Sequence, residues 1–116
     1  MIVKVNVSVR PNSYKGSFIV KLLEVDTFKD DLLAQKVEHL NGESMGYLRN
    51  RDFPEVIQFE FFVSALSFLE FNAELKAVVV ARGGEVIGES AVIDFSYPKD
   101  FDINGAKTLT LPEIEI

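Results

Sequence analysis

The stretch that decides the fold is residues 71–95, FNAELKAVVVARGGEVIGESAVIDF, in which two runs of β-forming residues flank a pair of glycines. Glycine readily adopts the positive φ of tight hairpins, so Gly83-Gly84 predicts a two-residue turn between antiparallel strands. The second strand is predicted over Glu85–Phe95, with Gly88 at a bulge. The first is predicted over Phe71–Arg82, and alternation places these residues on one face: Phe71, Ala73, Leu75, Ala77 and Val79.

Three strands are predicted before residue 41. The first alternates cleanly, with Val3, Val5, Val7 and Val9 on one face. Ser17–Val25 is apolar on both parities at its centre, which predicts a central strand. Leu32–Leu40 has partial helical spacing, but its strand neighbours favour a strand with these residues on one side: Leu33, Gln35, Val37 and His39.

Two further strands complete the pattern. A strand is predicted to begin at Phe53. Alternation places one set of residues on one face, Ile57, Phe59, Phe61 and Val63, and the other set on the opposite face, Gln58, Glu60 and Phe62. Lys107–Leu111 is predicted as the last strand, with Pro112 ending or offsetting its pairing. About seven short strands in one domain of 116 residues predict an all-β, single two-sheet antiparallel β-sandwich, immunoglobulin-like, with residues 1–116 as its only domain.

Composition narrows the classes of partner. The net charge of −6 argues against nucleic acid or an anionic membrane surface, because these ligands need clustered Lys and Arg. The absence of cysteine excludes disulfides, thiol catalysis and cysteine metal ligands. No run approaches the roughly 18 apolar residues of a membrane span, so no transmembrane segment is predicted.

The residues needed for catalysis are scarce. His39 is the only histidine, and a general base needs a positioned partner in a cleft. The sequence contains no nucleophile elbow, phosphate-binding loop, dinucleotide fingerprint or zinc-protease motif. We therefore expect a non-enzymatic protein with no catalytic residues and no cofactor.

One segment resembles the start of a calcium loop. Asp100-Phe101-Asp102-Ile103-Asn104-Gly105 places the oxygens of Asp100, Asp102 and Asn104 at alternate positions before a glycine that permits a sharp turn. Leu111 stands at the twelfth position, where the full motif needs a bidentate glutamate. The acidic loop Asp26–Asp31 would add ligands if it lay at the same end of the sandwich, as in C2 domains. A calcium-dependent or carbohydrate-binding module therefore stays open as an alternative.

The densest aromatic composition lies between Phe53 and Phe71. Phe62 has the opposite parity to the predicted inward face of its strand. The next residues are predicted to form a short corner, either one turn of helix or a 3₁₀ turn, with Ser64 as N-cap. An exposed apolar group here would receive an amphipathic helix or a strand of a protein or peptide partner. The candidate partner-binding residues are Phe62, Leu66, Phe68 and Leu69.

The order of segments resembles the YbaY/YscW family of bacterial β-sandwich lipoproteins, which includes pilotins of type III secretion. The likeness covers roughly residues 15–95 as a strand pattern: Phe18–Val25, Leu33-Ala34-Gln35, Ile57–Phe61, Ala73–Ala81, Gly83-Gly84 and Val86-Ile87. It implies a non-enzymatic periplasmic module that, in the pilotin branch, binds a secretin segment. Family members carry a lipidated cysteine after a signal peptide, and this sequence has neither. We expect a periplasmic location if the chain is a trimmed mature domain, and a cytoplasmic one if Met1 is the native start.

Overall fold

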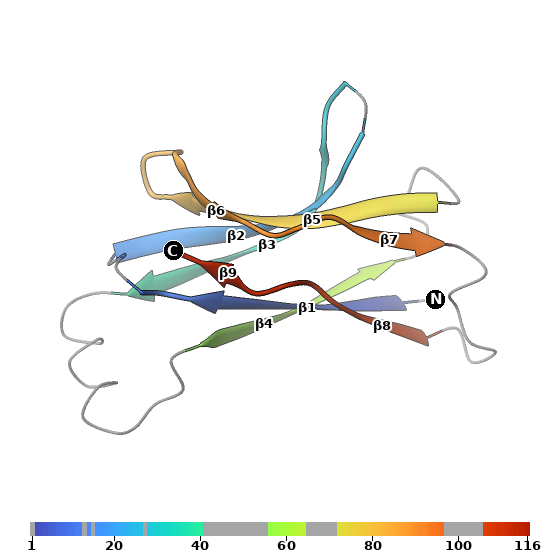
Figure 1. Ribbon diagram of the computed structural model, residues 1–116, viewed down its shortest axis with the longest axis horizontal. Helices are drawn as coiled ribbons and strands as arrows, with labels where there is room; N and C mark the ends of the chain where they lie inside the picture. Colours follow the sequence, from blue (N-terminus) through green and yellow to red (C-terminus); the bar gives the residue numbers. More distant parts are fainter. Residues whose placement is uncertain are drawn as a thin grey trace.

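Nine β-strands make up the fold in the computed structural model, which describes residues 2–12, 14, 16–26, 28–40, 56–64, 72–96 and 106–116 (Figure 1). Within these residues there is no helix, and hence none long and apolar enough to cross a bilayer. The strands are β1 (Ile2–Arg10), β2 (Gly16–Glu24), β3 (Asp31–Leu40), β4 (Ile57–Ser64), β5 (Asn72–Ala81), β6 (Val86–Glu89), β7 (Ile93–Ser96), β8 (Ala106–Thr110) and β9 (Ile114–Glu115).

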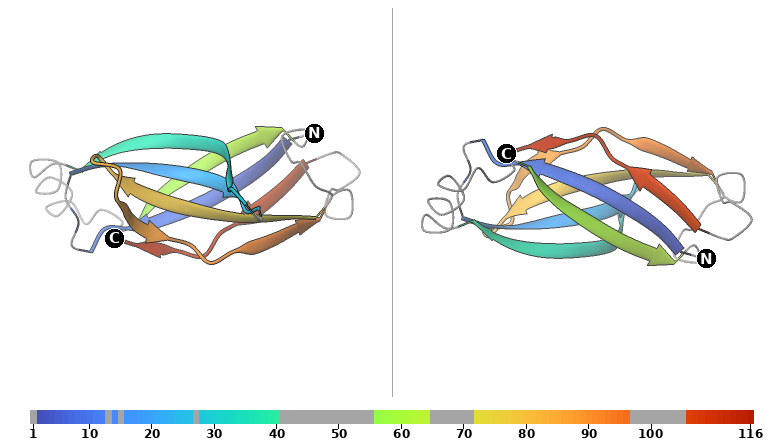
Figure 2. Two further views of the ribbon diagram at one scale, coloured as in Figure 1. Left: turned by 90° about the horizontal axis from the view of Figure 1, so that it is seen from above. Right: turned by 90° about the horizontal axis from the view of Figure 1, so that it is seen from below.

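The strands form two sheets that pack face to face. Sheet A has the order β4-β1-β8, with β9 also paired to β1, and sheet B has the order β3-β2-β5-β6, with β7 also paired to β5. Seen from above and below, the strands of one layer cross those of the other at an angle (Figure 2). The predicted all-β two-sheet sandwich is confirmed, with nine strands where about seven were expected.

Alternation of apolar residues builds most of the core between the sheets. Successive side chains of a strand point to opposite faces, so buried residues alternate along β1, β2 and β4, whereas the consecutive residues 77–80 of β5 are all buried. The four valines predicted to share a face of β1 are all 0% exposed. Across the layers, the rings of Phe18 and Phe59 meet edge to face, with 6.2 Å between their centroids.

Sheet A departs from the predicted antiparallel pattern on one side of β1. β1 pairs antiparallel with β4 but parallel with both β8 and β9. Parallel neighbours need a long crossover connection, and here the chain passes through sheet B before it returns to β1. Of the two effects predicted for Pro112, the offset is the one observed: β8 ends at Thr110, and beyond the proline Ile114 pairs with Val9 of β1 and is buried in the core.

The β5–β6 turn is wider than the predicted two-residue turn. The N–H of Ala81 donates to the Glu85 carbonyl at 2.7 Å, and the N–H of Gly84 donates to the Ala81 carbonyl at 2.8 Å. Of the two glycines only Gly84 has a positive φ, 94°. This arrangement is a three-residue loop, which needs one left-handed residue where a two-residue type I′ turn needs two.

The segment predicted as one strand over Glu85–Phe95 is two strands, β6 and β7. Between them lies Ser90, which is buried; its N–H donates to the Ala77 carbonyl, and its hydroxyl accepts a hydrogen bond from the Ala77 N–H at 2.9 Å. The bulge expected at Gly88 falls on its neighbour Ile87, because Val79 pairs with Gly88 and Val80 pairs with Val86.

The far end of the β2–β3 hairpin rises from the outer face of sheet B as an arm (residues 23–26 and 28–32; Figure 1). The arm begins at a bulge, where Leu22 pairs with Ala34 but Leu23 pairs with Leu32. Lys76 of β5 ties the arm to the sheet, since its Nζ lies 3.3 Å from Oδ2 of Asp30 and 2.9 Å from Oε1 of Glu89 on β6.

Candidate protein-binding surface

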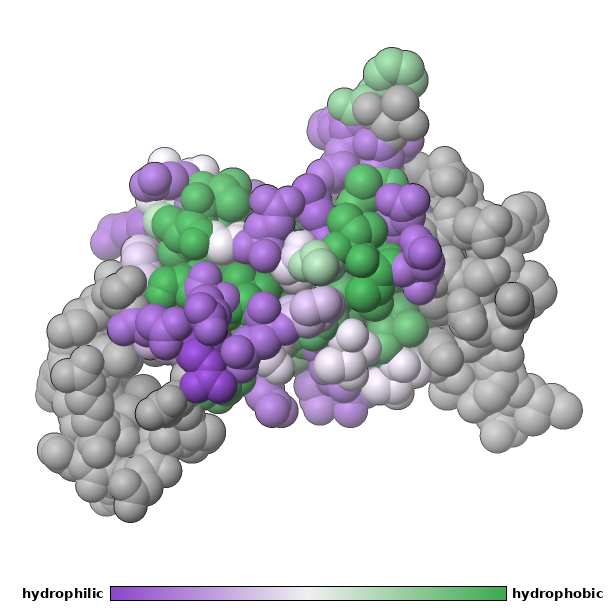
Figure 3. All heavy atoms as spheres, viewed as in Figure 1, coloured by the Kyte–Doolittle hydropathy of each residue, from purple (hydrophilic) through white to green (hydrophobic). Residues whose placement is uncertain are grey.

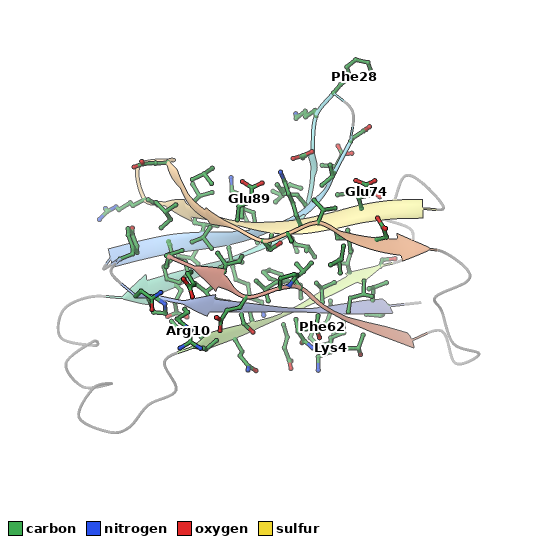
Figure 4. All side chains as sticks on the ribbon, in the orientation of Figure 1. Lys4, Arg10, Phe28, Phe62, Glu74 and Glu89 are labelled. Carbon is green, nitrogen blue, oxygen red and sulfur yellow. The ribbon has the colours of Figure 1, made fainter. Side chains whose placement is uncertain are left out.

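Phe62 is the predicted binding residue that the structure describes, and it projects from the outer face of sheet A (Figure 4). Its chain neighbours Phe61 and Val63 are 2% and 4% exposed, whereas Phe62 is 62% exposed. The opposite parity predicted for Phe62 is therefore confirmed. A large aromatic side chain in the middle of a regular strand is in contact with solvent.

Phe62 lies on the outward parity of β4, which is the last strand of sheet A in the described order. Among the described residues β4 pairs with β1 alone, which places Lys4 directly opposite Phe62. Nζ of Lys4 lies 3.0 Å from Oε1 of Glu60, the outward residue preceding Phe62 on β4. Ile2, one step along the same face of β1, is half exposed. The surface around Phe62 thus combines an apolar centre with a neighbouring ion pair.

The other sequence candidates fall outside the described residues. These are the corner residues Leu66, Phe68 and Leu69, and the calcium-loop residues Asp100, Asp102 and Asn104. His39 lies on β3 with its backbone opposite Ser17, and its side chain is also outside the description.

The acidic loop Asp26–Asp31 is the predicted second source of calcium ligands. Its carboxylate Asp30 is engaged in contacts within the chain. Oδ1 of Asp30 accepts a hydrogen bond from the Asp26 N–H at 3.2 Å, and Oδ2 faces Lys76. Within the part of the chain that the structure describes, no group of three or more His, Cys, Asp or Glu side chains is arranged to hold a metal ion. In the described part of this loop, Asp30 therefore stabilises the arm and its attachment to Lys76.

The pKa of Lys76 is raised by its carboxylate neighbours. Its hydrogen bond to Glu89 raises the pKa above the usual 10.5, partial burial opposes this effect, and the hydrogen bond to Asp30 reinforces it. Figure 4 shows Glu89 on the outer side of sheet B, near the base of the arm. Lys76 is therefore a charged bridge on that face and not a candidate proton donor at neutral pH.

A second exposed apolar surface lies on the outer face of sheet B and was not identified from the sequence. Cross-strand register aligns four residues in one row over four strands, here called the sheet B row: Val37, Ile19, Val80 and Val86. The two end members, Val37 and Val86, are 57% and 55% exposed. The sequence feature that points to this surface is the presence of apolar residues on both faces of the strand at Ser17–Val25. That pattern predicts a central strand, but it does not reveal which residues of other strands lie beside it.

Exposed apolar residues occur elsewhere on the molecule as well. In the view of Figure 3 they gather in two groups, one over β6 and one toward β7, with polar residues between them. Phe28, at the tip of the arm, is 98% exposed (Figure 4). Phe62 is thus one of several exposed apolar residues, and among the side chains that the structure describes it is the largest exposed one within a paired strand.

No family model, curated protein or solved structure matches this chain.

Proposed function

We propose that this chain is a non-enzymatic binding module that holds a protein or peptide partner against the outer face of sheet A, with Phe62 as the apolar anchor. The observation that carries the proposal is the 62% exposure of Phe62 between two buried neighbours on one strand. Covering such a side chain contributes about 1.5–3 kcal/mol, which is the scale of a single binding hot spot.

The strand that carries the anchor has a regular backbone before any partner arrives. Phe62 sits in an uninterrupted antiparallel register between β4 and β1, running from Ile2 opposite Ser64 to Val9 opposite Ile57. A strand that is already ordered loses little backbone freedom on binding, so more of the burial of Phe62 appears as affinity. The Lys4–Glu60 ion pair places one positive and one negative side chain beside Phe62, like the polar rim of a protein interface.

The partner that fits this surface is a polypeptide segment with an apolar side chain for Phe62. The net charge of −6 favours a segment that is neutral or basic, because association of like charges is slowed and weakened. A pilotin-like or chaperone-like role, as implied by the resemblance to the YbaY/YscW family, belongs to this proposal. In such a role the partner is held and not chemically altered.

Selection from a random peptide library displayed on phage tests the proposal without a known partner. We expect peptides that bind the wild-type protein and lose at least about tenfold in affinity for Phe62→Ser, which corresponds to roughly 1.4 kcal/mol. Val86→Ser is the matched control, because Val86 is similarly exposed but lies on sheet B.

Two outcomes would contradict the proposal. One is a selection that returns no peptide above background, and the other is a set of peptides that bind Phe62→Ser as tightly as the wild type. Equal urea midpoints of the two variants would establish that both are folded under the conditions of the binding measurement.

A further inference from the structure

β3 forms an open margin of sheet B. Within the described residues it pairs only with β2, and from Ala34 to Leu40 its register with β2 is unbroken. The outer side of such a strand carries backbone N–H and C=O groups that another strand can pair with. The question is which strand the side chains of β3 admit.

Two charged residues on β3 restrict that choice. Lys36 and Glu38 lie on the inward-facing parity of the strand, opposite Val20 and Phe18, which are both fully buried. Nζ of Lys36 sits at the opening between the sheets, 5.6 Å from the ring centroid of Phe61. Inward-pointing charges at a sheet edge discourage pairing with arbitrary strands, because an apolar strand would cover them without supplying a counter-charge.

The spacing of these two charges matches a second copy of the same strand. When β3 pairs antiparallel with itself about a two-fold axis through Val37, Lys36 of each copy faces Glu38 of the other. Opposite charges directly across an antiparallel pair stabilise it, and like charges destabilise it. Moving the axis to Lys36 or to Glu38 would bring each of those residues opposite itself, so only the axis at Val37 pairs both charges.

The outer face of β3 favours the same register. Val37, which is 57% exposed, meets its own counterpart on the axis. The sheet B row of Val37, Ile19, Val80 and Val86 then continues directly into the row of the second copy. Glu38 also takes part in an interaction within its own chain, and a carboxylate has acceptor positions for a further donor.

We infer that the chain forms a two-fold homodimer by antiparallel pairing of β3 with β3 of a second copy, centred on Val37 and secured by two reciprocal Lys36–Glu38 pairs. Such an interface is isologous and closes on itself, so it ends at two copies. The two B sheets join into one continuous sheet. Phe62 lies on the outer face of sheet A, so the inference is independent of the peptide binding proposed above.

Sedimentation equilibrium over a concentration series tests the inference through charge reversal and its rescue. We expect the wild type to show a concentration-dependent dimer, and Lys36→Glu to raise its dissociation constant on the order of tenfold or more, because it creates two like-charge pairs. The double variant Lys36→Glu/Glu38→Lys restores opposite charges and should recover the dimer. Lys29→Glu, in the loop of the arm, is the control with the same change in charge.

A second variant keeps the test decisive if Lys36→Glu perturbs folding. Val37→Lys places two ammonium groups on the axis at a position that is already exposed, so the monomer should fold while the dimer weakens. A wild type that stays monomeric at every concentration would overturn the inference. So would a dimer that is unaffected by Lys36→Glu, or one that the double variant fails to restore.

Discussion

Gly88 shows how one residue can decide whether two elements fit together. A Cβ at this position would lie 2.7 Å from Cγ2 of both Ile114 and Ile116, and 3.2 Å from the Glu115 carbonyl oxygen. A glycine in a strand often marks the close approach of another backbone, and here that backbone is β9. The packing of β6 of sheet B against β9 of sheet A depends on the absence of a side chain at residue 88.

We expect Gly88→Ala to lower the free energy of unfolding by about 1–3 kcal/mol, the usual cost of forcing extra volume into a packed contact. Urea denaturation measures this change, and limited proteolysis should show that the C-terminal residues become more accessible. A variant as stable as the wild type would mean that β9 can move away without cost.

Gly83→Ala is the matched control for this substitution. Nothing lies within 4 Å of a Cβ built at Gly83, and its φ is not positive. Alanine there should leave the stability unchanged or raise it by about 0.4–1 kcal/mol, because it reduces the freedom of the unfolded chain.

At the scale of elements, Lys76 joins the β2–β3 arm to the β5–β6 pair. Its two ion pairs, to Asp30 and Glu89, are partly exposed and are therefore worth roughly 0.2–1 kcal/mol each. Because the pKa of Lys76 in the folded state lies above its ordinary value of 10.5, the folded protein holds this proton more tightly than the unfolded chain. This contribution is fully present below pH 10.5 and is lost as the pH rises through the folded-state pKa.

We expect the stability difference between the wild type and Lys76→Met to be constant from neutral pH up to about pH 10.5 and to shrink above it. Urea unfolding at a series of pH values measures the difference. Lys29→Met, in the loop of the same arm, controls for the loss of one positive charge. A difference that stays constant into strong alkali would show that the bridge adds no pH-dependent stability.

Local alternation was enough to predict most strands and the parity of Phe62, because parity follows directly from the order of residues in a strand. The parallel partners of β1 were not predictable in this way, since which strand lies beside Val3 or Val9 depends on the path of the whole chain. The sheet B row was missed for the same reason, because it exists only once four strands are in register. The break at Ser90 depends on its hydrogen bonds to Ala77, which no local pattern indicates.

At the scale of the whole molecule, the first strand is completed by the last residues of the chain. β8 pairs with β1 from Ile2 to Asn6, and β9 pairs with it at Val9 and Arg10. Leu111 and Ile114, which flank Pro112, are both buried in the core. The sandwich therefore cannot close over β1 until the end of the chain is in place.

We expect a fragment of residues 1–96 to lack a cooperative unfolding transition, because it loses these strands and buried groups at once. A synthetic peptide of residues 106–116 contains all of β8 and β9, and its addition should restore the transition, as followed by circular dichroism. The same peptide with Ile114→Asp should fail to do so, because its carboxylate would be buried without a partner. A fragment that folds without the peptide would contradict this expectation.

The parallel pairing of β1 with β8 and β9 also determines how the molecule resists a mechanical load. Because these strands run in the same direction, the two ends of the chain emerge at opposite ends of sheet A (Figure 2). Tension applied between the ends acts along the strands, so the hydrogen bonds that join β1 to β8 and β9 are loaded together in shear and not opened one after another. The hydrogen bonds between β1 and its parallel partners, and not the exposed hairpins, would therefore carry the load. Forced unfolding is governed by the unfolding rate, so we expect the strength of this pairing to set that rate under tension.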